Sequence, residues 1–244
     1  MEKKKSVTKI VFTVIFTILI LGTFLLSKFY EFPAKWGVKT AYLYYGCICA
    51  CFLYSILFIK ANAKKIFVTL ALAFNVAADF FLILAPELGL LKLTPAQIQF
   101  VGVALFCGTQ FFYMLYTMWL TKGIGLKILN LALRVALCLV AYFVIPNYFA
   151  LSNLEMLSVL YILNSFVTLI FLLFNVKREG LLFLGFLLFF VCDVFIGLNH
   201  CATFLGWSGA FFEFALKSDI SSWVYIPGIL LIATSSVWAK NRTE

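Results

Sequence analysis

Long apolar stretches run along nearly the whole chain, and short polar segments separate them. Each stretch holds roughly 18 to 24 mainly apolar residues, enough for an α-helix to cross a hydrocarbon layer about 30 Å thick. The pattern predicts eight such helices, at residues 8–27, 38–59, 66–85, 97–120, 126–145, 154–174, 181–198 and 222–239. We therefore expect an all-α, polytopic integral membrane protein with a single transmembrane domain over residues 1–244.

Composition supports this expectation, because 64% of the 244 residues are apolar and only 12% are charged, with a mean hydropathy of +1.07. Soluble proteins are closer to half apolar and a quarter charged.

The first stretch follows Lys3, Lys4 and Lys5, a pattern that a cleaved secretory signal would share. It is longer than a typical signal core, and residues 27–30 lack a small-x-small cleavage site, so a retained first helix is the better interpretation.

The net charge of +9 follows the predicted topology. An even number of spans puts both termini on one side, and most basic loop residues fall there, whereas Lys28, Lys35, Lys39, Lys92 and Lys217 fall on the other. The positive-inside rule therefore predicts cytoplasmic termini, in the plasma membrane if the protein is bacterial. The cytoplasmic set is Lys3, Lys4, Lys5, Lys9, Lys60, Lys64, Lys65, Lys122, Lys127, Lys177, Arg178, Lys240 and Arg242. These residues form no continuous stripe, so no nucleic-acid partner is expected.

The cysteines indicate neither a disulfide framework nor a metal site. Six of the seven lie inside predicted spans. Cys47, Cys49 and Cys51 are two residues apart, and this spacing turns about 200° on a helix, so neighbours point to opposite sides. The chain also lacks a nucleophile elbow, an HExxH motif, a Walker loop and a dinucleotide fingerprint. We expect no metal and no cofactor, which leaves acid–base chemistry or binding.

Two aspartates, Asp79 and Asp193, lie deep in the third and seventh predicted spans. Each is about 12 or 13 residues into its span, so both lie roughly 18 to 20 Å from the cytoplasmic boundary. A carboxylate at this depth costs at least about 2.5 kcal/mol, so each should face the protein interior or a wet cavity. Two carboxylates in one such cavity would not both ionise, which supplies an acid and a base. The alternative is that each is an interhelical hydrogen-bonding residue.

Helical spacing brings further polar residues to the aspartates. Asn75 lies four residues before Asp79 and so on its face. His200, the only histidine, lies seven residues after Asp193, which is two turns further out on the same face if the helix continues. It could act as a proton shuttle or be an exposed residue at the helix end.

In the fourth span Gly102, Phe106, Gln110 and Tyr113 form one helical stripe, and Gly185, Phe189 and Asp193 repeat this spacing in the seventh span. The glycine permits close helix approach, while Gln110 and Tyr113 can donate hydrogen bonds to a cavity.

Arg134 is the only arginine deep in a predicted span, with Asn130 on its face, and a buried cation needs a partner. It could pair with Asp79, Asp193 or Glu155, or bind a substrate phosphate. Glu155 itself suits the start of the sixth span, where a helix N-terminus tolerates a carboxylate.

The segments around Asp79 and Asp193 resemble each other weakly and lie four spans apart, so their helices run in the same direction and two four-helix halves are conceivable. The longest outer connection, residues 200–221, is rich in aromatics and is either an interfacial segment, a lid or an ordinary loop.

These motifs resemble the YhhN-type lysoplasmalogenase family of eight-helix membrane proteins. The resemblance rests on Asp79 followed by Phe-Phe-Leu-Ile-Leu, on the two stripes and their order along the chain, and on Tyr225 before the apolar tail. The chain departs from the family pattern at three positions. The family usually has Gly where this chain has Ala78, often His where it has Gln110, and Gln where it has Gly228.

The resemblance implies a hydrolase for the vinyl ether bond of lysoplasmalogens, giving a fatty aldehyde and a glycerophospho-alcohol without a metal or nucleotide. Its partners would be a lysophospholipid or ether-lipid substrate and the surrounding membrane lipids. Asp79 and Asp193 would be the catalytic pair, with Asn75, Gln110, Tyr113, Arg134 and His200 as substrate-binding residues. The competing interpretation is a membrane carrier or lipid-binding protein that uses the aspartates as a proton or cation relay, and a purely structural protein is the third.

Overall fold

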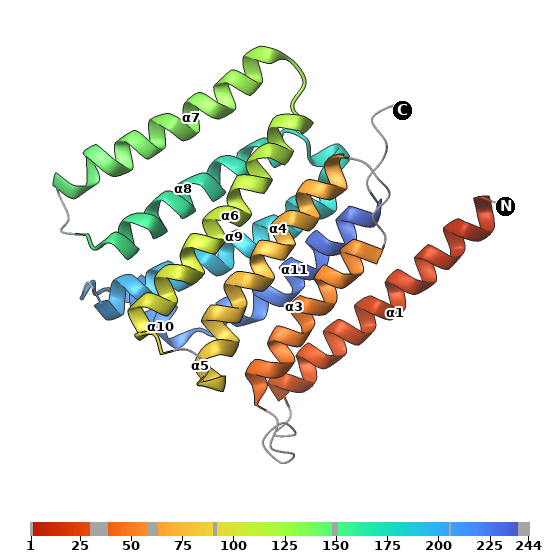
Figure 1. Cartoon of the computed structure of the whole chain (residues 1–244), viewed down its shortest axis with the longest axis horizontal. Helices are drawn as coiled ribbons and strands as arrows, with labels where there is room; N and C mark the ends of the chain where they lie inside the picture. The colour runs from red at the N-terminus through yellow and green to blue at the C-terminus, as the bar shows by residue number, and fades with distance from the viewer. Residues whose placement is uncertain are drawn as a thin grey trace.

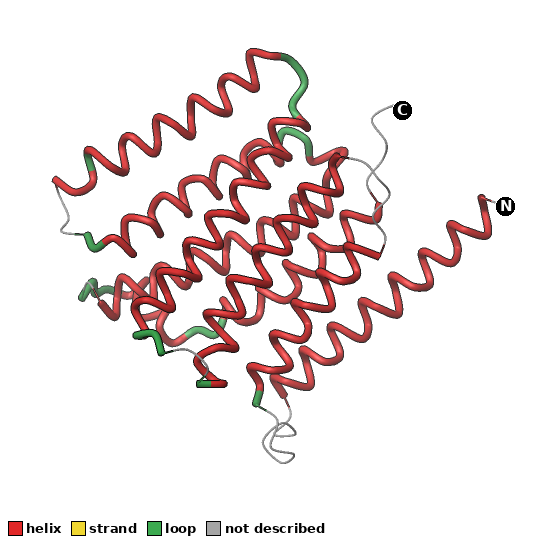
Figure 2. The backbone as a smooth tube through the Cα atoms, in the orientation of Figure 1, coloured by secondary structure: helices red, strands yellow, loops and turns green. Residues whose placement is uncertain are grey.

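The computed structural model describes residues 2–29, 39–57, 63–89, 92–147, 151–204 and 206–238, and within these ranges it contains helices and loops but no strand. Figure 2 shows that the connections described between helices are short. The long helices are α1 (Glu2–Phe29), α3 (Thr40–Leu57), α4 (Ala63–Asp79), α6 (Pro95–Leu120), α7 (Ile124–Phe143), α8 (Asn153–Leu173), α9 (Val176–Phe204) and α11 (Ile220–Trp238). The shorter elements are η1 (Phe80–Leu84), α5 (Ala85–Leu88), η2 (Ile145–Asn147) and α10 (Ala210–Lys217).

The predicted all-α membrane architecture is confirmed. Among the described residues, seven helices, or runs of successive helices, are long and apolar enough to cross a membrane, and α11 adds a shorter apolar stretch over Ile220–Ser235. The seventh span was predicted to begin at residue 181, whereas α9 begins at Val176 and is kinked at Glu179 (φ −122°, ψ 29°). The aromatic connection after α9 contains a short helix, α10, which packs against α9.

Side-chain caps explain where two of the helices begin. Thr94 and Gln97 form a capping box ahead of α6, in which each side chain accepts a hydrogen bond from the other's main-chain N–H. Ser152 and Glu155 do the same for α8, so the carboxylate expected at a helix N-terminus is in place. Such boxes satisfy N–H groups that the first helical turn leaves without a partner.

Five helices form a closed ring, because α4 packs on α6, α6 on α8, α8 on α9, α9 on α11, and α11 on α4. The other three long helices lie outside the ring: α3 against α4 and α11, α1 against α3 and α11, and α7 against α8. In Figure 1, α1 and α7 lie at opposite edges of the bundle. The ring takes helices from both halves of the chain, so the halves are not two separate bundles.

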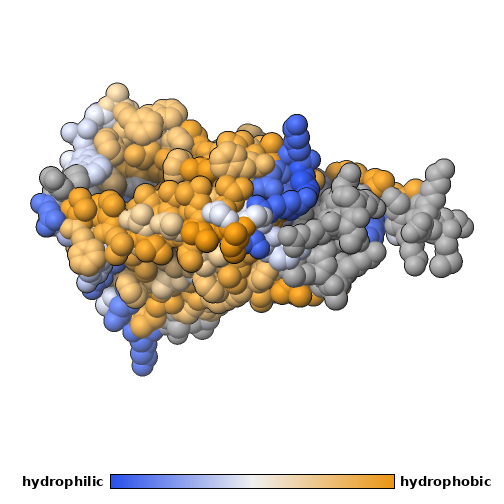
Figure 3. All heavy atoms as spheres, turned by 90° about the horizontal axis from the view of Figure 1, so that it is seen from above, coloured by the Kyte–Doolittle hydropathy of each residue, from blue (hydrophilic) through white to orange (hydrophobic). Residues whose placement is uncertain are grey.

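The bundle has two ends. At one, which we call the termini end, α1 begins and α11 finishes, and the other, which we call the α10 end, carries α5 and α10 (Figure 1). As predicted, α4 and α9 run in the same direction, from the termini end to the α10 end. Figure 3 shows a face of the bundle covered mainly by hydrophobic side chains, as a lipid-facing surface requires.

Which side of the membrane each end faces stays a prediction. The structure does not describe many of the basic side chains behind it, namely those of Lys3, Lys4, Lys5, Lys35, Lys60, Lys64, Lys65, Lys240 and Arg242.

Helices α9 and α11 approach each other closely through two glycines. A Cβ added to Gly185 would lie 2.9 Å from the main-chain oxygen of Gly228, and a Cβ added to Gly228 would lie 3.0 Å from that of Gly185. Only residues without a side chain permit this distance between helices. Gly102 has a similar role in α6, since its Cβ would lie 2.5 Å from Cγ of Leu82. The glycines of the two stripes therefore serve close packing within the ring.

Candidate active site

The structure brings Asp79 and Asp193 together inside the ring. Asp79 ends α4 and is 3% exposed, whereas Asp193 lies within α9 and is partly exposed. The two carboxyl groups are close enough for their charges to interact, and Cys192 lies within reach of both. Two carboxyl groups from distant parts of the chain therefore share one buried region, as the sequence predicts.

Asp79 lies where the helix changes its hydrogen-bonding pattern. The next five residues, Phe80–Leu84, form a π-helix, in which the N–H of Ala85 donates to the carbonyl of Phe80. Pro86 follows, and it has no N–H to donate to the carbonyl that an α-helix would pair with it. Short π-helical segments occur frequently at functional sites.

A tyrosine hydroxyl binds each aspartate. Tyr225 of α11 donates to Oδ2 of Asp79, and Tyr161 of α8 donates to Oδ2 of Asp193 at 2.6 Å. Both tyrosines are buried, at 7% and 8% exposure. A phenol donor stabilises a carboxylate once it has given up its proton, so both pairs are suited to proton transfer.

Tyr161 is a site residue that sequence reasoning missed, and Tyr225 was noted only for the family resemblance. The available signal for Tyr161 was a tyrosine in the middle of an apolar span, followed at helical spacing by Asn164, Ser165 and Thr168. With no residue of α8 assigned to the site, that helix had no predicted function.

Phenyl rings connect the two tyrosines. Phe106 lies 5.9 Å from Tyr161 and 6.0 Å from Phe189, whose ring is 5.7 Å from Tyr225, all between ring centroids. This apolar wall lowers the local dielectric constant and so strengthens electrostatic interactions at the carboxyl groups.

Three of the predicted substrate-binding residues are buried, and each has at least one side-chain polar atom that meets no partner in hydrogen-bonding geometry. Asn75 accepts a bond from Thr109 at 3.1 Å, while its Nδ2 has no partner. Gln110 lies beside the hydroxyl of Tyr161, but neither of its amide atoms reaches hydrogen-bonding geometry. Tyr113 stacks edge-on against Phe186 at 5.0 Å, and its hydroxyl has no partner. All three are 3% exposed or less, so these atoms are available to a polar group inside the ring.

Each of the five ring helices thus contributes a side chain: Asp79 from α4, Gln110 from α6, Tyr161 from α8, Asp193 from α9 and Tyr225 from α11. Among the described residues, no group of three His, Cys, Asp or Glu side chains could hold a metal ion. The chemistry that this arrangement supports is proton transfer by carboxyl groups.

Arg134 does not meet the aspartates. Its hydrogen bonds go to neutral oxygens of Asn130, Asn164 and Thr168, at 2.8 to 3.1 Å. The ion pair that sequence reasoning considered, with Asp79, Asp193 or Glu155, is not formed among the described residues. Oxygens of α7 and α8, from side chains and from the main chain of Asn164, accept hydrogen bonds from the guanidinium instead.

His200 lies near the end of α9, four residues before Phe204, and is partly buried. Its Nε2 is 3.8 Å from Oε1 of Glu155 on α8. The two side chains join α8 and α9 toward the α10 end, beyond Asp193.

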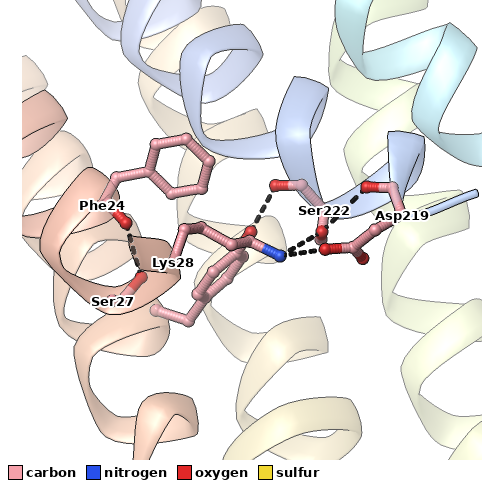
Figure 4. Close-up of polar contacts among 6 residues, drawn as sticks. Phe24, Ser27, Lys28, Asp219 and Ser222 are labelled. Carbon is pink, nitrogen blue, oxygen red and sulfur yellow. Dashed lines mark hydrogen bonds and ion pairs between the residues drawn. The ribbon is translucent and has the colours of Figure 1, made fainter. Parts of the chain in front are cut away.

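A polar cluster fixes the start of α11, and its member Ser222 lies three residues before Tyr225. Figure 4 shows Lys28 of α1 reaching Asp219 and Ser222. The hydroxyl of Tyr44 donates to the main-chain oxygen of Ser222, and the ammonium of Lys28 is 5.8 Å from the Tyr44 and Trp223 rings. Partial burial acts to raise the pKa of Asp219, but the hydrogen bonds from Lys28 and Ser222 and the charge of Lys28 outweigh it and lower that pKa.

Comparison with known proteins adds a family to this geometry. Residues 34–236 match the model of the YhhN family, which covers most of the chain and all the side chains of the aspartate site. No curated protein and no solved structure matched the chain. Because the match covers well over half of its length, the chain belongs to the YhhN family.

Proposed function

We propose that the protein is a membrane-embedded hydrolase that cleaves the vinyl ether bond of a lysoplasmalogen, giving a fatty aldehyde and a glycerophospho-alcohol. The observation that carries the proposal is the pair of carboxyl groups, each held by a tyrosine, inside a ring of apolar helices. Membership of the YhhN family supports it.

The reaction needs an acid and a base near one carbon–carbon double bond. A carboxylic acid delivers a proton to the alkene carbon that is not bonded to oxygen, and an oxocarbenium ion results. Water adds to the carbon that is bonded to oxygen, while the other carboxylate takes up a proton from it. The hemiacetal then breaks its carbon–oxygen bond, which gives the aldehyde and the alcohol, and the carboxyl groups return to their starting protonation. Asp79 and Asp193 supply the two groups.

The remaining buried amides have a place in this scheme. The Gln110 amide lies beside Tyr161, on the Asp193 side, where it can orient the attacking water or the glycerol hydroxyl. Asn75 and Tyr113 offer further buried hydrogen-bonding atoms within the ring helices. Glu155 and His200 lie toward the α10 end of the same helices, where a polar headgroup can remain hydrated. Arg134 is occupied by neutral protein oxygens, so it has no role in substrate binding in this scheme.

The test is aldehyde release by the purified protein from a lysoplasmalogen, beside two matched lysolipids, one with a saturated alkyl ether and one with an ester. We expect aldehyde from the vinyl ether alone, because the saturated ether has no double bond to protonate. In heavy water the alkene carbon receives a deuteron from the carboxyl group. The aldehyde is reduced to the alcohol as it forms, and this product should carry one deuterium on the carbon next to the former carbonyl. Folded protein that is inert toward all three lipids would rule out the proposal.

A second candidate, a proton or cation carrier, has one observation in its favour. Glu179 is buried near the termini end of α9, where it lies beside Arg178 and against Tyr116 of α6. A buried carboxyl group there could relay protons toward the aspartates. In proteoliposomes this function predicts ion-coupled uptake that Glu179→Gln abolishes, whereas the hydrolase needs no such relay.

A further inference from the structure

The side chain of Gln110, on α6, is an amide buried inside the ring. It is 3% exposed, and neither its Nε2 nor its Oε1 has a hydrogen-bond partner among the described residues. Leaving a buried polar group without a partner costs free energy, so folded proteins contain few such groups. An amide kept in this state is suited to a polar group of a ligand that enters the ring.

The neighbours of the Gln110 amide limit what that group can be. The Tyr161 hydroxyl lies beside the amide, but its one proton goes to Oδ2 of Asp193 at 2.6 Å, so it cannot also donate to Oε1. Phe106, one turn earlier on α6, lies 5.9 Å from Tyr161 and 6.0 Å from Phe189, between ring centroids, and a phenyl ring has no N–H or O–H to donate. Oε1 therefore needs a donor that these neighbours do not supply. An alcohol hydroxyl supplies one, and its oxygen can accept from Nε2.

Two threonines of α6 show how a buried polar side chain is satisfied within this bundle. Thr109 donates to Oδ1 of Asn75 at 3.1 Å, and Thr117 accepts from Nδ2 of Asn130 at 3.3 Å. Both threonines are fully buried. Hydrogen bonding between helices therefore explains Thr109 and Thr117, but it does not explain Gln110, which lies between them in the sequence.

The lipid of the proposed reaction carries a suitable hydroxyl next to the bond that is cleaved. In a lysoplasmalogen the central glycerol carbon bears a free hydroxyl, and two carbon atoms separate that hydroxyl from the ether oxygen. The covalent structure therefore keeps the hydroxyl close to the ether when the double bond lies between Asp79 and Asp193. Gln110 is on the side of Asp193, because it lies beside the tyrosine that binds this carboxyl group.

We propose that Gln110 binds the free hydroxyl on the central glycerol carbon of the substrate. The hydroxyl donates to Oε1, and its oxygen accepts from Nε2. Gln110 is thus a specificity-determining residue, which distinguishes a lysolipid from a lipid that lacks this hydroxyl. The inference rests on the proposed function for the identity of the lipid, but the contact can also be measured by binding, without hydrolysis.

The experiment compares a lysoplasmalogen with its 2-deoxy analogue, in which hydrogen replaces the hydroxyl, on the purified full-length protein. In the parent we expect kcat/KM for aldehyde release to be at least tenfold higher for the lysoplasmalogen, because the analogue leaves the amide unpaired. Gln110→Leu should lower kcat/KM for the lysoplasmalogen about tenfold or more and change that for the analogue much less. Differences in intrinsic reactivity between the two lipids cancel, since each variant is compared with the parent on the same lipid.

Two further variants make the comparison specific. Gln110→Met fills nearly the same volume as glutamine without an amide, so it should reproduce the loss if Gln110→Leu does not fold. Thr117→Val is the matched control, because it removes a buried hydroxyl almost two turns further along the same face of α6. Its preference for the lysoplasmalogen over the analogue should match that of the parent.

Equal slowing of both lipids by a folded Gln110 variant would overturn the proposal, because the amide would then act on the attacking water or in packing. An equal loss of preference in Thr117→Val would overturn it as well.

Binding separates this inference from the proposed reaction. A lysolipid with a saturated alkyl ether, which has no double bond to protonate, and its 2-deoxy analogue are titrated into the parent and Gln110→Leu. The parent should bind the lipid with the hydroxyl at least tenfold more tightly, and Gln110→Leu should lose this preference. The binding preference without aldehyde release removes only the proposed reaction, whereas aldehyde release without a preference in either measurement removes only the role of Gln110.

Discussion

Asp79 and Asp193 lie on parallel helices of one ring, but their surroundings differ. Asp79 is almost fully enclosed, ends a regular α-helix at a π-helical segment, and is held by Tyr225. Asp193 lies within a continuous part of α9, is partly exposed, and is held by Tyr161 beside the loosely bound amide of Gln110. We therefore propose that a lipid substrate reaches the site from the Asp193 side, with the more deeply buried Asp79 on the enclosed side.

Replacing either aspartate is the strongest way to break this comparison. We expect Asp79→Asn and Asp193→Asn each to reduce the rate of aldehyde release at least 100-fold, the order of magnitude that general acid–base catalysis supplies. Single-turnover kinetics with a lysoplasmalogen measures the effect, and helix content by circular dichroism shows that the variants are folded. If Asp79→Asn kept the parent rate, the enclosed aspartate would be a structural residue and the two-carboxyl mechanism would fail.

Helix α9 carries Asp193, and α11 carries Tyr225, which binds Asp79. The contact between these helices therefore joins the two sides of the site, and Gly228→Leu tests it. The new side chain would meet the main chain of α9, since even a Cβ would lie 3.0 Å from the oxygen of Gly185. Overpacking of this kind costs roughly 1–3 kcal/mol, so we expect a lower melting temperature in detergent and weaker activity.

Gly197→Leu is the control for this substitution, because nothing lies within 4 Å of a Cβ at Gly197. Its melting temperature should stay near that of the parent. Equal destabilisation by both substitutions would mean that the close approach at Gly185 and Gly228 has no special role.

The two tyrosines sharpen the comparison. Hydrogen bonds to charged groups contribute about 1.5–3 kcal/mol, so Tyr225→Phe and Tyr161→Phe should each slow aldehyde release on the order of tenfold or more. We expect the larger loss from Tyr225→Phe, because Asp79 is the more enclosed carboxyl group. Rate constants measured with one substrate preparation decide the order, and a larger loss from Tyr161→Phe would reverse our assignment of the open and enclosed sides.

The smallest effect concerns Lys28, which fixes the start of α11 and so the helix that carries Tyr225. The pKa of Asp219 is lower in the folded protein, so the folded state binds fewer protons than the unfolded state. This stabilisation is fully present above the unfolded pKa, about 4, and is lost as pH falls through the lowered folded pKa.

Lys28→Met should remove a few tenths of a kcal/mol at neutral pH, because the carboxylate is largely exposed. It should also flatten the acid limb of a plot of melting temperature against pH. An acid limb as steep as that of the parent would show that the Lys28 cluster does not hold α11 through its charge.

Much of the architecture follows from hydrophobic patterning alone. Apolar stretches of the right length specify helices because backbone polar groups in lipid have no other partners, and for this reason the eight predicted spans correspond to eight helices. The predicted apolar span begins at residue 181 because Arg178 and Glu179 are charged, whereas the helix itself begins at Val176. The family resemblance depended on Asp79, Asp193 and two helical stripes, and the match over residues 34–236 confirmed it.

The sequence by itself determined that two aspartates lie deep in parallel membrane helices, because depth and direction follow from counting residues along each span. Only the tertiary structure decided their neighbours, since contacts across a bundle depend on how each helix is rotated and which helices are adjacent. Tyr161, which shares no stretch of sequence with Asp193, became its partner because α8 packs on α9. Arg134, which had three candidate carboxylate partners in the sequence, has neutral ones because α7 lies outside the ring and meets only polar atoms of α6 and α8 there.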